Sequence, residues 1–308
     1  MVRSGEGAEK TALRVVMQGM SRRAFLRCFG VVVLPRISVQ AKAILPSRQA
    51  IRRRIRWVFT FVNPSGVALE AQHFWCYLPA NVPLVQSLVD IESSAPFQLL
   101  EDEFGHRVFA IEFDRIQPFS GKVVTATATV EMAPEATANL LEEPGAWLAP
   151  ERFIESDHPL IRTLAQELKG DSSPENSARA IYEWVRDNVA YAGYIEEQRG
   201  ALRALQERRG DCTEYADLVV ALARSAGIPA RSVGGYVSEW DFTPKAQDYH
   251  NWAELYISGA WRIVDAQKGN WLPVSGNYIT FRIQRDSLPS PVGDAHRYRI
   301  SDGLQVRW

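Results

Sequence analysis

The sequence has few cysteines, and they are not spaced for a metal site or a disulfide framework. Cys28, Cys76 and Cys212 are the three cysteines among 308 residues, with no C-x-x-C pair and no cysteine–histidine cluster at zinc spacing. The chain is therefore not a disulfide scaffold, and we expect no metal and no cofactor. A bond between Cys76 and Cys212 in an oxidising compartment would consume the Cys212 thiol, so we expect both thiols to be free.

Long apolar runs, repeats and excess positive charge are also missing. No segment approaches the roughly 20 apolar residues that span a bilayer, so no transmembrane segment is expected. The net charge is −1, from 35 basic and 36 acidic side chains. Residues 1–43 hold eight of the basic and two of the acidic ones, so the rest carries 27 against 34, a net charge of −7. Such an acidic chain is a poor binder of nucleic acid.

The N-terminal segment resembles a twin-arginine export signal. Arg22 and Arg23 stand ahead of Phe25-Leu26 and a short apolar stretch, and Ala41-Lys42-Ala43 offers a cleavage site. The alternative is a basic arm with a fortuitous arginine pair, since the apolar stretch is short and Arg36 interrupts it. We expect residues 1–43 to be an export signal and the mature protein to be periplasmic or secreted.

Residues 44–140 have the alternation of half-buried strands. Apolar and polar side chains alternate from Ile55 to Phe61 and again from Val124 to Val130, with turn residues between such segments. Short antiparallel strands at these intervals predict an immunoglobulin-like β-sandwich. Two isolated histidines, His73 and His106, fall in this part and are interpreted as structural.

Residues 141–308 are predicted to form an α+β domain. Pro159 and Pro174 open helical patterns, and strand patterns follow at 232–237, 250–257, 261–266 and 278–283. The predicted fold class is thus α+β, an antiparallel sandwich followed by a mixed domain, with a boundary near residue 140.

Cys212 opens one helix of this second domain. Apolar residues at helical spacing follow it, and Gly227 with Pro229 ends the pattern. Free backbone N–H groups and the helix dipole at that position favour a thiolate, whereas the expected N-cap, Asp211, opposes it. The thiol therefore needs a histidine partner to act as a nucleophile.

A predicted hairpin supplies that partner. A two-residue loop at Ser258-Gly259 pairs Ile257 with Ala260 and places Trp252 opposite Asp265. His250 and Asp265 then become diagonal neighbours on one face, within reach of a hydrogen bond. A three-residue loop would separate them.

Cys212, His250 and Asp265 have the chemistry of a nucleophile, a general base and acid, and an orienting carboxylate. The segments RRGDCTEYADLVVALARSAGIPARSVGGYV and DYHNWAELYISGAWRIVDA resemble the transglutaminase-like core, a papain-type superfamily with Cys, His and Asp in this chain order. The resemblance runs from about residue 178 to 271 and assigns these three roles to the same three residues. The strands from IRWVFTFVNPSG to Met132 are similar to the immunoglobulin-like domain that precedes the core in bacterial members.

The second donor of the oxyanion hole, beside the Cys212 backbone N–H, has two candidates. Gln206 matches the glutamine that papain-like enzymes carry six residues before the cysteine. In the transglutaminase branch the donor comes from further upstream, which favours Tyr191.

These features predict a thiol enzyme that cleaves amide bonds of a peptide or protein substrate through a thioester. Water as acceptor makes it a peptidase or amidase, which we favour, and an amine as acceptor makes it a protein-glutamine acyltransferase. The calcium-regulated animal transglutaminases have further domains for which this chain has no room. The alternative of another class is a non-catalytic peptide-binding module.

Overall fold

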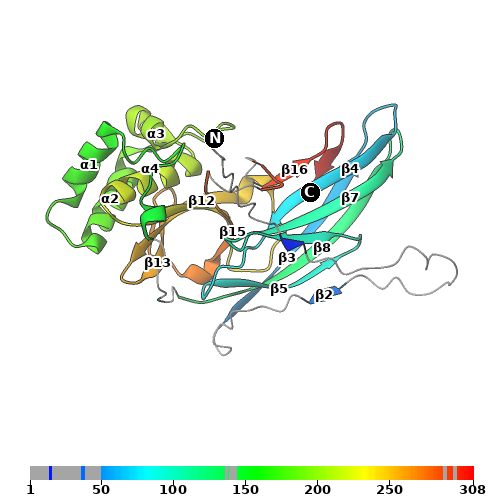
Figure 1. Cartoon of the computed structure of the whole chain (residues 1–308), viewed down its shortest axis with the longest axis horizontal. Helices are drawn as coiled ribbons and strands as arrows, with labels where there is room; N and C mark the ends of the chain where they lie inside the picture. The colour runs from blue at the N-terminus through cyan, green and yellow to red at the C-terminus, as the bar shows by residue number, and fades with distance from the viewer. Residues whose placement is uncertain are drawn as a thin grey trace, which may run out of the picture.

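A computed structural model describes residues 14–15, 36–38, 50–135, 138, 144–286, 290–293 and 297–308. The predicted leader lies outside these residues, including Arg22, Arg23, Cys28 and the cleavage site, apart from two short strands within it. The predicted domain boundary near residue 140 lies outside them as well. Figure 1 shows the α-helices at one end, a sandwich of strands at the other and a curved sheet between them.

The first unit consists of two antiparallel five-stranded sheets. One has the order β1-β6-β7-β4-β16 and the other β17-β3-β8-β5-β2. The strands that precede residue 135 are β1 (Arg14–Val15), β2 (Arg36–Ser38), β3 (Ile51–Val62), β4 (Leu69–Leu78), β5 (Gln86–Ser93), β6 (Gln98–Glu101), β7 (Arg107–Ile116) and β8 (Gly121–Met132).

The alternation in the sequence decides which side of these strands is buried. Ile55, Trp57, Phe59 and Phe61 of β3 are all buried, while Arg56 and Val58 between them are exposed. Phe59 meets Phe74 of β4 in the opposite sheet, with ring centroids 5.0 Å apart. One apolar core therefore holds the two sheets together.

The C-terminus returns to this unit. Strand β16 (Tyr298–Ile300) pairs with β4, and strand β17 (Gln305–Arg307) pairs with β3. Both are drawn in red among the strands of the sandwich in Figure 1. The sequence division at residue 140 assigns these last residues to the second domain, whereas their backbone hydrogen bonds join them to the first. Strands this short carry no alternation that indicates a partner sheet.

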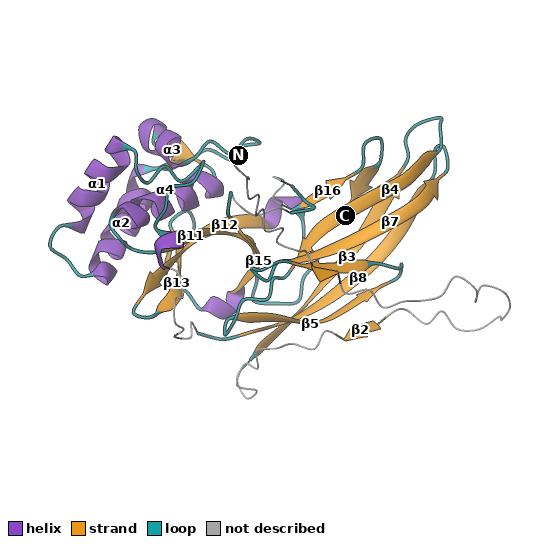
Figure 2. Ribbon diagram, viewed as in Figure 1, coloured by secondary structure: helices purple, strands orange, loops and turns teal. Residues whose placement is uncertain are grey.

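The second unit is α+β, as predicted. Its sheet has the order β14-β13-β12-β11-β15, and helices cover one face of it (Figure 2). A short parallel pair, β9 with β10, lies beside the helices. Its longer elements are η1 (Pro144–Trp147), α1 (Pro159–Lys169), α2 (Pro174–Asn188), α3 (Ala201–Glu207), α4 (Cys212–Ser225), β11 (Ala230–Val237), β12 (Tyr249–Ile257), β13 (Ala260–Asp265) and β15 (Tyr278–Ile283). The shorter ones are β9 (Ala190–Tyr191), β10 (Arg209–Gly210), η2 (Ala246–Asp248), β14 (Asn270–Trp271) and η3 (Ser275–Asn277).

The hairpin register is confirmed. Ile257 pairs with Ala260 and Ala253 with Val264, as a two-residue loop requires. Ser258 and Gly259 have φ angles of 53° and 76°, the left-handed pair typical of such a tight turn. A slip by one residue would have moved His250 or Asp265 to the other face.

The two units share an apolar contact behind the second sheet. Ala80 and Val82 of the first unit form one core cluster with Trp252 and Trp261 of the second. The backbone N–H of Ala80 donates to the Thr280 carbonyl at 2.9 Å. Since the helices cover the other face, the sheet of the second unit is buried on both sides.

Candidate active site

Helix α4 begins at Cys212 for local reasons. The Asp211 side chain accepts a hydrogen bond from the backbone N–H of Thr213 at 2.7 Å. The Glu214 side chain accepts one from the backbone N–H of Asp211 at 3.0 Å, which completes a capping box. The prediction of a helix that starts at the cysteine is confirmed, with Asp211 as its N-cap.

Cys212 lies in a cavity of about 630 Å³. Its walls come from the segment after β9, the first turn of α4, the start of β12 and the residues that lead into β16. Four tyrosines give the cavity an aromatic lining, Tyr191, Tyr194, Tyr249 and Tyr298. A cleft of this size and mixed lining suits an extended peptide or a small amide.

His250 and Asp265 form a buried pair. The distance from His250 Nε2 to Asp265 Oδ2 is 2.8 Å, and the two residues are 5% and 1% exposed. The carboxylate thus accepts from Nε2–H, so the unprotonated nitrogen of a neutral His250 is Nδ1. His250 does not line the cavity, but its neighbours Tyr249 and Asn251 do.

Two further groups hold Asp265 in place. The Tyr278 hydroxyl donates to Oδ2 at 2.9 Å, and the Lys268 backbone N–H donates to Oδ1 at 3.0 Å. Asn270 Nδ2 in turn donates to the Tyr278 oxygen at 2.9 Å. Sequence reasoning missed Tyr278 and Asn270, because β15 and β14 reach Asp265 only through the sheet order.

The surroundings of the Cys212 thiol favour its protonated form. Burial, and then the charge of Asp211, raise the pKa of the Cys212 thiol to about 11, while hydrogen bonds from Asn251 lower it. Asp211 thus opposes a thiolate, as expected of the N-cap carboxylate, and burial opposes it more strongly. The sulfur is largely shielded from water beside the N-cap carboxylate, so the resting thiol is protonated at neutral pH. Cys76, in the sandwich core, is more deeply buried, and burial raises the pKa of its thiol to about 12.

The two oxyanion candidates lie in different places. Tyr191 lines the cavity, and burial together with the charges of Cys212 and Asp211 raises the pKa of its hydroxyl, which keeps it a donor. Gln206 is exposed on α3 and is not part of the cavity wall. The structure therefore favours Tyr191.

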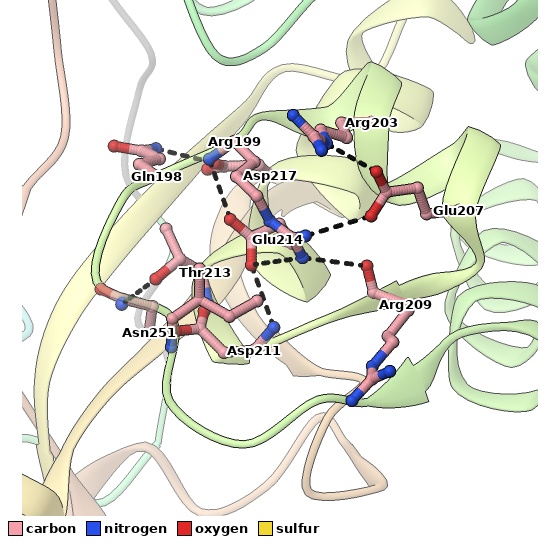
Figure 3. Close-up of polar contacts among 11 residues, drawn as sticks. Gln198, Arg199, Arg203, Glu207, Arg209, Asp211, Thr213, Glu214, Asp217 and Asn251 are labelled. Carbon is pink, nitrogen blue, oxygen red and sulfur yellow. Dashed lines mark hydrogen bonds and ion pairs between the residues drawn. The ribbon is translucent and has the colours of Figure 1, made fainter.

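Three carboxylates, from helix α4 and its N-cap residue, bind the chain segment that forms one wall of the cavity. They stand three residues apart and so share one side of the helix. Each accepts a hydrogen bond from the segment that follows β9, as Figure 3 shows around Glu214. The bonds run from the Ile195 backbone N–H to Asp211 at 3.0 Å, from the Arg199 backbone N–H to Glu214 at 3.0 Å, and from Gln198 Nε2 to Asp217 at 2.7 Å.

Asp217 is the most unusual of these acids. It is fully buried, and its other oxygen accepts a hydrogen bond from the Ser232 hydroxyl at 2.8 Å. Burial raises its pKa to about 8; Gln198 and Ser232 lower it, and the charges of Glu214 and Glu155 raise it. Asp217 therefore keeps its proton at neutral pH.

Within the described ranges, no three or more histidine, cysteine, aspartate or glutamate side chains are placed to hold a metal ion. In the same part of the chain, no helix is both long and apolar enough to cross a membrane.

The part of the chain that holds the candidate site matches a known protein family. Residues 162–273 match the family model of the transglutaminase-like superfamily. Over these residues the chain therefore carries a transglutaminase-like domain, as the resemblance predicted.

Individual relatives are distant. An uncharacterized protein of Mycobacterium leprae (strain TN) is 25% identical over 195 residues, which cover 56% of this chain and 67% of that protein. The human kyphoscoliosis peptidase is 28% identical over 122 residues, 37% of this chain and only 18% of the peptidase. A crystal structure from Cytophaga hutchinsonii, of a protein provisionally classed as a cysteine protease, has a TM-score of 0.60 and 22% identity. It covers 84% of this chain, and the match spans 88% of that structure. This last likeness shows a shared fold.

Proposed function

We propose that the protein hydrolyses amide bonds of a peptide or protein substrate through a thioester on Cys212. The observation that carries this proposal is the buried His250–Asp265 hydrogen bond of 2.8 Å, on the strand whose neighbouring residues line the Cys212 cavity. Asp265 orients the ring and stabilises its protonated form, which is the role of the carboxylate in a nucleophile–histidine–acid triad.

In the first half of the reaction, His250 Nδ1 takes the Cys212 proton while the sulfur attacks the amide carbonyl carbon. The resulting oxyanion accepts hydrogen bonds from the Cys212 backbone N–H and the Tyr191 hydroxyl. When the tetrahedral intermediate collapses, the C–N bond breaks, and His250 gives its proton to the departing amine. The acyl group remains on Cys212 as a thioester.

In the second half, water attacks the thioester. His250 takes a proton from the water, the C–S bond breaks, and the proton returns to the sulfur. The products are a carboxylic acid and the free thiol, so the cycle closes without a cofactor. The raised pKa of the Cys212 thiol makes this base role necessary, because the protonated thiol is a poor nucleophile.

The decisive experiment offers the purified protein a peptide library with and without a primary amine, and mass spectrometry identifies the products. We expect cleavage or deamidation in both arms and no activity in Cys212→Ala. Conjugation of the amine as the main product would assign the protein to the acyltransferases. Binding of peptides without any turnover would make it a non-catalytic module.

Two further proposals concern the rest of the chain. We propose that residues 1–43 direct export through Arg22 and Arg23, so that the enzyme acts in the periplasm or outside the cell. We also propose that residues 44–140 form an immunoglobulin-like domain and residues 141–308 the catalytic core, with the two C-terminal strands contributing to the sandwich. The pairings of β16 with β4 and of β17 with β3 support that last amendment.

A further inference from the structure

Asn251 is buried where a polar side chain is unexpected. It is 4% exposed on β12, and alternation places it on the same face as Ala253 and Leu255, which pack into the core beneath the helices. The rings of His250 and Trp252, the residues on either side of it, lie 6.3 Å apart. A buried amide on an apolar face has to find hydrogen-bond partners.

Those partners are the first two residues of α4. Asn251 Nδ2 donates to Thr213 Oγ1 at 2.9 Å and to Cys212 Sγ at 3.7 Å. Figure 3 shows the amide of Asn251 pointing at Thr213. On its other side, Asn251 Oδ1 accepts from Gln284 Nε2 at 3.1 Å. The amide is therefore fixed at both ends, with its nitrogen toward the sulfur.

The neighbouring strand leaves space for this arrangement. Gly234 of β11 stands opposite Asn251, and a Cβ there would lie 2.8 Å from Asn251 Oδ1 and closer still to the Tyr249 hydroxyl. A Cβ at position 234 would therefore require the Tyr249 hydroxyl or the Asn251 amide to shift. The fold thus accommodates the Asn251 side chain at the cost of a glycine in the middle of a buried sheet.

The groups around Cys212 indicate what the Asn251 amide does for the sulfur. Burial and the carboxylates of Asp211 and Asp265 all disfavour a negative sulfur, whereas the backbone and side-chain N–H groups of Asn251 favour it. Hydrogen bonds to a charged acceptor are stronger than those to a neutral one, so these bonds strengthen as the proton leaves the sulfur.

We propose that Asn251 stabilises the thiolate of Cys212 during attack, as a catalytic residue in addition to Cys212, His250 and Asp265. Its amide N–H groups bond to the sulfur and to Thr213, which fixes the direction of the donor. The S–H proton goes to His250 Nδ1, and the electron pair stays on the sulfur, held by Asn251, until the C–S bond forms. This role rests on the proposed function, because it concerns the same nucleophile.

The test measures the rate at which iodoacetamide alkylates Cys212 as a function of pH in the full chain, with peptide mapping to separate Cys212 from Cys76. We expect Asn251→Ala to move the midpoint of the Cys212 profile up by about one pH unit, which is about a tenfold loss of thiolate below the midpoint. Asn251→Asp has the same size but adds a charge, so a larger shift is expected. The Cys76 profile serves as the internal control.

A matched pair of variants separates this role from simple packing. Thr213→Val removes the acceptor that orients Asn251 and should shift the midpoint in the same direction, whereas Thr213→Ser keeps the hydroxyl and should not. Melting temperatures are measured on each preparation. If Asn251→Ala does not fold, Thr213→Val decides the question with Asn251 intact.

Unchanged Cys212 profiles in folded Asn251→Ala and Thr213→Val would overturn the role of Asn251, and so would equal shifts in Thr213→Val and Thr213→Ser. The assay contains no amide substrate. A wild-type protein whose thiol depends on Asn251 but which turns over no peptide would therefore refute the proposed function and leave this inference standing.

Discussion

His250 and Asp265 are joined by a 2.8 Å hydrogen bond between residues that are 5% and 1% exposed, at the end of a hairpin whose turn fixes their register. Because the carboxylate also accepts from the Tyr278 hydroxyl and the Lys268 N–H, its position does not depend on the histidine. The pair is thus preorganised, which is what a general base needs before substrate arrives.

Asp265→Asn should abolish most turnover. The amide cannot stabilise a protonated His250, and in a serine protease triad the equivalent change costs about 10⁴-fold in kcat. Since the Cys212 thiol is protonated at rest, deprotonation by His250 is part of every cycle, and we expect a loss of at least about 10²-fold. Turnover and melting temperature are to be measured on the same preparation. Retained activity with an unchanged melt would assign Asp265 to structure.

Tyr278→Phe should have a smaller effect of the same kind. The change removes one donor from Asp265 and leaves the acceptor of Asn270 Nδ2 missing, which typically costs about 1 kcal/mol of stability. We expect kcat to fall by roughly tenfold with KM little changed. Tyr256→Phe is the control, because Tyr256 lies near the hairpin turn of β12 and does not line the cavity. Equal losses in both variants would show that Tyr278 has no special part in orienting the pair.

Asp217 should make the free energy of unfolding depend on pH. Its pKa is about 8 in the folded protein, against the ordinary aspartate value of 3.8, so the folded state holds a proton that the unfolded state releases between these values. The stabilisation is complete below about pH 4, declines as pH rises, by up to about 1.4 kcal/mol per pH unit, and is gone above about pH 8.

Asp217→Asn should remove this decline, because the amide is neutral at every pH and can still bond to Gln198 and Ser232. Chemical denaturation at pH 5, 6, 7 and 8 gives the slope for both proteins. Asp171→Asn, a change at an exposed acid, should leave the slope as it is in the wild type. Parallel curves for wild type and Asp217→Asn would refute the raised pKa.

Replacing Arg22 and Arg23 with lysine should hold the precursor in the cytoplasm. The arginine pair of such a signal is read by a receptor, so a lysine pair of the same charge is not equivalent. Fractionation of cells that express the two forms, followed by immunoblotting, measures the exported share. Equal export of the two forms would show that the arginine pair is not an export signal and that this segment is a basic arm.

Sequence alone predicted those features whose causes lie within a few residues. The helix start at Cys212 follows from its N-cap, Asp211, the β12–β13 register follows from a two-residue turn, and the alternation in β3 decides which side of a strand is buried. The Cys212, His250 and Asp265 set came from such local patterns together with the resemblance to the transglutaminase-like core.

Only the tertiary structure decided what depends on distant segments meeting. Tyr278 reaches Asp265 through the sheet order, Asn251 meets Cys212 where β12 passes under α4, and β16 and β17 close the sandwich from the far end of the chain. The pKa of the Cys212 thiol belongs here too. The sequence shows the helix start and its N-cap, whereas burial depends on the packing of all surrounding segments, and burial is the main cause that raises the pKa of this thiol to about 11.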